Sequence, residues 1–149
     1  MSKIDDVDLS IIRMLQADGR VSFREISDKL KVAEGTVYNR VNKLRDQGVI
    51  RNFMVDVDYA KLGYDLTAVI GIIVKGGHLP EIEKKIAAED NVTAVYDVTG
   101  EYDAIVVAKF KERDDLNKLV KKMTALEHVD RTYTMVALNV VKEKHGIEL

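Results

Sequence analysis

The sequence contains no cysteine and no tryptophan, and it has a single proline among 149 residues. Without cysteine the chain can form no disulfide, no thiolate metal site and no cysteine nucleophile. No apolar run approaches the roughly 20 residues that a membrane-spanning helix needs. The acidic first residues lack the basic and apolar regions of a signal peptide. We therefore expect a cytoplasmic protein without a membrane partner.

Charge is distributed unevenly along the chain, although the net charge is only −2. Residues 20–53 carry eight Lys or Arg against four Asp or Glu, a balance of +4. Residues 54–149 carry 13 against 17, a balance of −4. This asymmetry favours one basic module that faces a partner, joined to an acidic body.

Three short helices are predicted in the first third of the chain. The first covers residues 5–17, where apolar residues recur at helical spacing. Ser22 and Glu25 form a capping-box pattern, which predicts the start of a short second helix. A third helix begins near Glu34, after a tight joint, and this arrangement is typical of a helix-turn-helix. The apolar stripe of the third helix consists of Val37, Val41 and Leu44.

The pattern changes after residue 53, so a helix-turn-helix domain is assigned to residues 1–53. Residues 54–63 lose the helical period and predict a hinge strand or extended linker. Residues 64–149 have the order strand, helix, strand, strand, helix, strand, which is that of a ferredoxin-like βαββαβ domain. The predicted fold class is therefore α+β. The expected strands are residues 64–75, 92–99, 103–110 and 129–141.

The predicted sheet is apolar on both faces. In its first strand Ile70 and Ile72 point to one face, and Val69 and Ile73 point to the other. Two helices can cover only one face of four strands, so the other face needs a second cover. A sheet from a second copy of the chain is the economical choice. The alternative is that the strands are apolar on both faces only because they are rich in β-branched residues, and that no partner covers the second face.

Groups of residues at 8–12, 15–20, 36–44, 48–50, 62–64 and 99–103 have a characteristic order and spacing, and the last is Thr-Gly-Glu-Tyr-Asp. Together they resemble the Lrp/AsnC family of transcriptional regulators, also called feast/famine regulators, over nearly the whole chain. The resemblance implies a winged-type helix-turn-helix domain, a hinge strand and a ferredoxin-like RAM domain. It further implies homodimers, octamers of four dimers in many members, and a response to a free amino acid.

The third helix is the expected DNA-reading element, because the recognition helix of this motif lies in the major groove. Asn39 and Arg40 have the chemistry to pair with adenine and guanine, and Thr36 shares their side of the helix. A dimer would present two such helices to a pseudo-palindromic double-stranded site. The remaining predicted DNA contacts are Arg24, Lys31, Lys43 and Arg45 to phosphates, Gly35 through its backbone, and Tyr38.

Three residues at the recognition helix leave alternatives open. Gly35 either lets the backbone approach a phosphate or reflects a relaxed constraint at a helix end. Tyr38 either reaches the sugar-phosphate backbone or packs on its own domain. The family usually places Ser at the cap of this helix, but this sequence has Ala33, a cap poorer by about 1 kcal/mol. Either the start of the helix is loose or Thr36 supplies a compensating bond.

The turn at residues 99–103 has a structural and a functional interpretation. By itself, Gly100 suits the unusual backbone of a hairpin and Asp103 marks the edge of a strand. The family resemblance implies that this turn lines an effector pocket between dimers. Asp103 would then meet the ammonium group of an amino acid, the backbone near Gly100 its carboxylate, and Tyr102 would form an apolar wall. The predicted effector residues are Thr99, Gly100, Glu101, Tyr102, Asp103, Thr132 and Thr134.

No catalytic residue, metal site or cofactor is predicted, apart from the amino-acid effector. His78, His128 and His145 have no metal-ligand spacing and are expected on the surface. Two alternatives remain. Sirohaem decarboxylases resemble the same architecture yet are enzymes, and an effector-sensing protein could lack DNA binding altogether. The +4 balance of residues 20–53 and the polar face of the third helix favour DNA binding over both.

Overall fold

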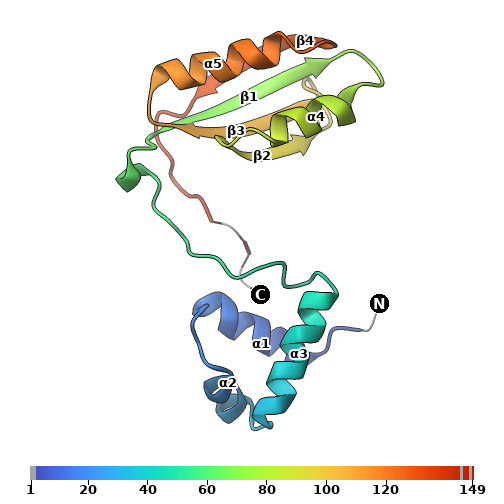
Figure 1. Ribbon diagram of the computed structural model, residues 1–149, viewed down its shortest axis with the longest axis vertical. Coiled ribbons are helices and arrows are strands. Elements are labelled where there is room, and N and C mark those ends of the chain that lie inside the picture. Colours follow the sequence, from blue (N-terminus) through green and yellow to red (C-terminus); the bar gives the residue numbers. More distant parts are fainter. Residues whose placement is uncertain (1–2, 145, 148) are drawn as a thin grey trace. The chain divides into compact units, whose positions relative to one another are not determined.

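The computed structural model describes residues 3–144, 146–147 and 149, which form two compact units (Figure 1). The first unit comprises Met1–Val57 with Lys144–Leu149, and the second comprises Asp58–Glu143. The end of the chain is expected in the second domain, but residues 147 and 149 contact the first helix. Arg13 Nε donates to the carbonyl of Leu149 at 2.9 Å, and Gln16 Nε2 donates to that of Ile147 at 3.1 Å.

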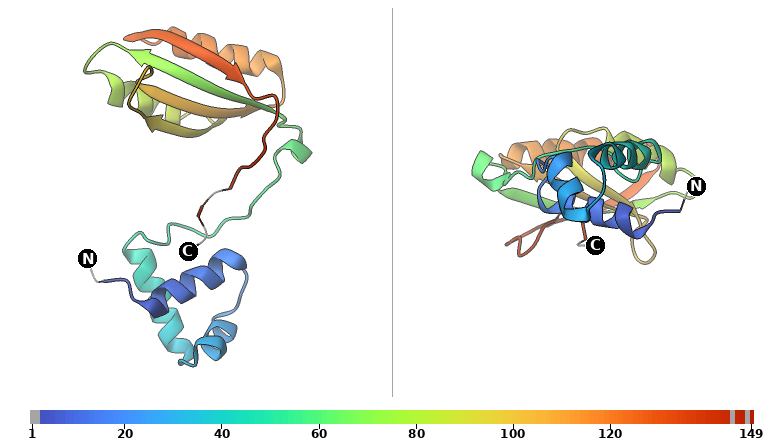
Figure 2. Two further views of the ribbon diagram at one scale, coloured as in Figure 1. Left: turned by 180° about the vertical axis from the view of Figure 1, so that it is seen from behind. Right: turned by 90° about the horizontal axis from the view of Figure 1, so that it is seen from below.

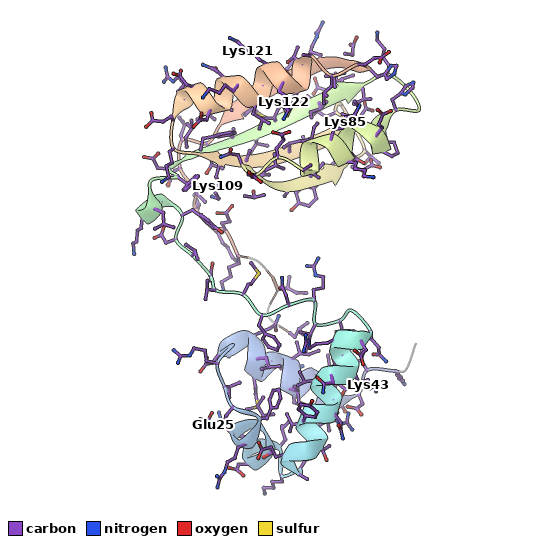
Figure 3. All side chains as sticks on the ribbon, viewed as in Figure 1. Glu25, Lys43, Lys85, Lys109, Lys121 and Lys122 are labelled. Atoms are coloured by element: carbon purple, nitrogen blue, oxygen red, sulfur yellow. The ribbon has the colours of Figure 1, made fainter. Side chains whose placement is uncertain are left out.

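The first unit contains the three predicted helices: α1 (Asp6–Ala17), α2 (Phe23–Leu30) and α3 (Glu34–Asp46). The capping box of α2 is confirmed, because the Glu25 N–H donates to Ser22 Oγ at 3.1 Å and the Ser22 N–H donates to Glu25 Oε2 at 2.9 Å. Figure 3 labels Glu25 on α2. The buried side chains at the centre of the three helices are Ile11, Ile26, Val37 and Val41.

The joint between α2 and α3 is short. Lys31 ends α2 in the left-handed region, with φ of 54°, and α3 begins three residues later at Glu34. Ala33 precedes α3 with extended backbone but supplies no side-chain cap, as expected for an alanine. Residues 51–57, which follow the last turn of this unit, adopt no regular helix or strand.

The second unit is a four-stranded antiparallel sheet with two helices. After a short 3-10 turn, η1 (Ala60–Leu62), its elements are β1 (Leu66–Val74), α4 (Leu79–Ala87), β2 (Val92–Asp97), β3 (Ala104–Phe110), α5 (Arg113–Thr124) and β4 (Val129–Val136). The strand order is β2-β3-β1-β4, which is the predicted ferredoxin-like arrangement. Pro80 occupies the first turn of α4, where its missing N–H costs nothing.

Both helices lie on one face of this sheet (Figures 1 and 2). Their inner sides pack on alternate residues of the two central strands, including Ile70, Ile72, Val106 and Phe110. No helix or strand within the described residues of this unit covers the opposite face. We call that face the open face, and its residues are Val69, Gly71, Ile73, Ala94, Tyr96, Ile105, Val107, Tyr133 and Met135, with the polar Thr67, Lys109 and Arg131 at its margins.

The last strand is shorter than predicted, since β4 ends at Val136 and not at residue 141. Val136 pairs with Ala68, and the Ala137 N–H still donates to the carbonyl of Thr67. The register places Leu66, the first residue of β1, opposite residue 138, so β1 offers no partner to residues 139–141 of the predicted strand. The segment after β4 instead places Glu143 beside Lys109, with 2.7 Å between Oε2 and Nζ (Lys109 is labelled in Figure 3).

None of the helices formed by the described residues is both long and apolar enough to cross a membrane.

Candidate functional site

The outward side of α3 carries three exposed side chains of the predicted DNA-binding set: Thr36, Tyr38 and Asn39. They are exposed because Val37, Val41 and Leu44 turn the other side of the helix into the core. Tyr38 remains 55 % exposed and meets Phe23 edge to face, with 6.3 Å between ring centroids. Its ring therefore packs partly on its own domain while its surface stays accessible.

Arg40 does not lie free on the same surface. Its Nη1 donates to both Asp5 oxygens, at 2.8 and 2.7 Å, and to Asp8 Oδ1 at 2.7 Å. The guanidinium beside Asp5 holds the pKa of that carboxyl below its ordinary value of 3.8, and the Asp8 N–H lowers the pKa further. The same contacts raise the pKa of Arg40, the Asp5 hydrogen bond contributing most. Arg40, expected from the sequence to pair with a base, binds the start of α1 in this structure.

The other predicted DNA contacts surround α3. Arg24, Lys31 and Arg45 are exposed. Lys43, labelled in Figure 3, is 39 % exposed, and its Nζ lies 4.0 Å from Asp8 Oδ2. Gly35 has open space where a Cβ would lie, since no atom comes within 4 Å. The start of α3 thus offers accessible backbone at Gly35 beside the short polar side chain of Thr36, whereas the cations Lys43 and Arg45 lie in its last turn.

The predicted effector turn joins β2 to β3, and Thr99, Gly100 and Glu101 are exposed there. Gly100 has φ of 127°, a conformation that side chains rarely allow. Asp103 fastens the turn to β1, because its Oδ2 accepts from the Val74 N–H at 2.7 Å and its own N–H donates to the carbonyl of Ile72 at 2.9 Å. The carboxylate expected to meet an ammonium group therefore already uses one oxygen within the fold.

The predicted effector residues separate onto the two faces of the sheet. The Tyr102 ring covers Gly71 on the open face and lies 5.4 Å from the Tyr133 ring, measured between centroids. Thr132 and Thr134 pair with Ile72 and Ile70, so they share the helix-covered face. Thr132 Oγ1 lies 3.3 Å from Thr124 Oγ1 of α5. A single chain therefore does not bring all the predicted effector residues together in one pocket.

Two hollows, of about 380 and 360 Å³, lie beside α4 and contain none of the predicted effector residues. The first is bounded by Glu83 and Lys84 of α4 and by Val95 and Asp97 of β2. The second lies between α4 and α5, with Lys85 and Lys122 (Figure 3) at its border.

Sequence reasoning missed two clusters. No pattern in the sequence links Asp5 and Asp8 to Arg40, which lies 35 and 32 residues away. His78 and His128 stack with 3.5 Å between ring centroids and an interplanar angle of 11°. His145 lies outside the described residues. Within those described, no group of three or more His, Cys, Asp or Glu could hold a metal ion.

Two family models match the chain in the same order as the two units. A winged helix-turn-helix DNA-binding model matches residues 4–51, and the Lrp/AsnC ligand binding domain matches residues 67–147. The second match alone covers more than half of the chain.

Relatives agree with these matches. An uncharacterized HTH-type transcriptional regulator of Pyrococcus furiosus is 53 % identical, over 98 % of this chain and 99 % of its own. The HTH-type transcriptional regulator FL11 of the same organism is 39 % identical, over 94 % and 93 %. The structure of E. coli AsnC has a TM-score of 0.89 at 28 % identity and covers 99 % of both chains.

The match therefore confirms the predicted resemblance, the α+β fold class and the prediction of a DNA-binding regulator over an enzyme. DNA is its partner, and the second domain is of a small-molecule-binding type. The chain belongs to the Lrp/AsnC family and is a DNA-binding transcriptional regulator of that type.

Proposed function

We propose that this regulator binds pseudo-palindromic DNA as a homodimer and that a free amino acid, bound at the turn of residues 99–103, shifts its assembly. The observation that carries the proposal is the open face of the sheet. Tyr96 and Met135 on this face are 56 % and 45 % exposed, beside the half-buried Val69, Ile105 and Val107. A sheet that is apolar on both faces needs a cover on each, and a second copy supplies a self-complementary one.

Dimerisation through the open face determines how DNA is bound. Two chains carry two α3 helices, so half-sites should lie about 34 Å apart, one helical turn, or at a multiple of it. We assign base reading to Asn39 and Thr36, which are exposed on α3. Phosphate contacts, which fix orientation without specifying sequence, are assigned to Lys43, Arg24, Lys31 and Arg45.

The amino-acid site is proposed at the edge of the sheet where the turn of residues 99–103 is exposed. Asp103 holds β1 with Oδ2, which leaves Oδ1 to meet an ammonium group, and the backbone at the exposed Gly100 would meet a carboxylate. Thr132 and Thr134 lie on the other face of the sheet. A pocket that includes them with the turn must be completed by a neighbouring chain, so binding favours one assembly over another.

The oligomeric state tests the open face. We expect sedimentation to give a dimer or a larger assembly, with Met135→Lys dissociating it because a charge would be buried in an apolar interface. The matched control is Asn117→Lys, which places the same charge on the exposed side of α5. A folded wild-type monomer at micromolar concentration would refute the dimer.

Footprinting and selection of bound DNA test the second part. We expect one pseudo-palindromic site, with binding that weakens as salt increases. Lys43→Ala should reduce the salt slope by about one unit and affect all sequences alike. Protection without symmetry would contradict binding as a dimer.

A thermal-shift screen of the twenty amino acids tests the effector site. We expect at least one to raise the melting temperature of the wild type and to change its sedimentation. Asp103→Asn removes the charge but keeps an oxygen that can accept from the Val74 N–H, so the fold should persist while the ligand shift is lost. An undiminished shift in Asp103→Asn would place the site elsewhere, and no shift in the wild type would leave the regulator without an amino-acid effector.

A further inference from the structure

Arg40 joins the recognition helix α3 to the start of α1. Asp8, its partner at 2.7 Å, has a fully buried side chain, whereas Arg40 is 27 % exposed and Asp5 is 50 % exposed. Asp5 and Asp8 also cap α1 reciprocally, because the Asp8 N–H donates to Asp5 Oδ1 at 2.9 Å and the Asp5 N–H donates to Asp8 Oδ2 at 3.2 Å. Arg40 is thus part of the polar cluster that begins α1.

Because Asp8 is buried, breaking its ion pair with Arg40 would be energetically costly. A buried carboxylate is stable only when it is paired and hydrogen-bonded. If Arg40 turned outward to a base, the remaining cation would be Lys43, whose Nζ lies 4.0 Å from Asp8 Oδ2. Reading a guanine with Arg40 would therefore leave Asp8 poorly paired inside the protein.

The recognition helix has few other polar anchors. Its cap residue, Ala33, donates and accepts no side-chain bond, and its buried side consists of Val37, Val41 and Leu44. An arginine bound to two carboxylates is a strong contact, and removing it would leave the charge of Asp8 unpaired in the interior. Pairing of Arg40 with Asp8 therefore keeps α3 seated on α1, with Asn39 exposed on the outward side of the helix.

We infer that Arg40 is a positioning residue: with Asp8 and Asp5 it orients α3 so that Asn39 and Thr36 read the DNA, and no base is read by Arg40. This inference rests on the proposed role of α3 as the recognition helix. It changes the interpretation of Arg40 that the sequence alone favours.

The test compares selected DNA sequences between variants that separate the cluster from base reading. Arg40→Met leaves Asp8 without its main partner, so we expect affinity to fall at least tenfold for all sequences alike. Asp8→Leu combined with Arg40→Met removes both charges, since buried ion pairs can be replaced by apolar residues of similar volume. We expect this double variant to regain most of the lost affinity with the wild-type base preference at every position.

Two further variants keep the test decisive. Arg40→Lys keeps a cation for Asp8 but lacks the fork that pairs with guanine, so its base preference should also match the wild type. Asn39→Ala should relax the preference at one base pair of each half-site. Relaxed preference at one base pair in Arg40→Lys, or in the folded double variant, would overturn the inference, as would a double variant no better than Arg40→Met. If the wild type itself selects no sequence, the proposed function fails instead.

Discussion

The ring of Tyr102 occupies the place where a side chain at Gly71 would begin. A Cβ at residue 71 would lie 2.7 Å from Cδ1 and Cε1 of Tyr102. The contact brings the turn of residues 99–103 onto the open face of the sheet, next to Tyr133. The proposed effector turn and the proposed dimer surface therefore share one aromatic side chain.

Gly71→Ala should destabilise the second unit, because the methyl group cannot fit unless Tyr102 moves. Overpacking of this kind costs about 1–3 kcal/mol of the free energy of unfolding, which urea denaturation would measure. Gly76→Ala is the control, since no atom lies within 4 Å of a Cβ there and its φ is not positive. Equal losses of unfolding free energy in the two variants would mean that the Tyr102 ring can move away from residue 71 without cost.

Ala33→Ser should stabilise the first unit. Residue 33 already has the extended backbone of a helix cap, with φ of −69° and ψ of 145°, so a serine hydroxyl could accept from the first free N–H groups of α3. The expected gain is about 1 kcal/mol in the free energy of unfolding. Ala88→Ser, at the opposite end of a helix, should bring no such gain. No gain in stability from Ala33→Ser would mean that the first N–H groups of α3 already have hydrogen-bond partners.

Gly35→Ala separates stability from DNA contact. The free protein has room for the methyl group, and alanine favours a helix over glycine by roughly 0.5–1 kcal/mol, so thermal stability should not fall. If a phosphate lies against this backbone, affinity for DNA should nevertheless decrease, and we expect that decrease in a gel-shift titration. Gly19→Ala, outside α3, is the control for affinity. Undiminished binding by Gly35→Ala would remove residue 35 from the interface.

Acid should weaken the first unit through Asp5 and Glu25. The Arg40 guanidinium lowers the pKa of Asp5 below 3.8, and the backbone N–H of Ser22 lowers the pKa of Glu25 below 4.5. Each carboxylate therefore contributes stability above its ordinary pKa and loses it as the pH falls through the lower folded-state pKa.

Urea unfolding between about pH 6 and pH 3 checks this dependence. The wild type should lose stability below pH 4.5, whereas Asp5→Asn and Glu25→Gln should each be less stable near neutral pH and flatter with pH. Asp56→Asn, in the segment after the helices, is the control. Parallel curves for all four proteins would exclude these two carboxylates as the cause.

The sequence by itself determined the local structure and the family. Ser22 and Glu25 started α2 where predicted, Pro80 lay in the first turn of α4, and the spacing of Val37, Val41 and Leu44 identified the buried side of α3. These features were predictable because a cap or an apolar stripe involves residues a few positions apart, whose relation follows from the geometry of a helix. The order of strands and helices likewise gave the ferredoxin-like fold.

Only the tertiary structure decided which distant residues meet. Arg40 pairs with Asp5 and Asp8, Tyr102 covers Gly71, and β4 cannot extend beyond residue 138, because its partner β1 begins opposite that residue at Leu66. In each case the deciding neighbour comes from another part of the chain, so no local pattern marks it. The pairing of a buried carboxylate, the contact at a glycine and the length of a strand each depend on a residue that only folding brings beside them.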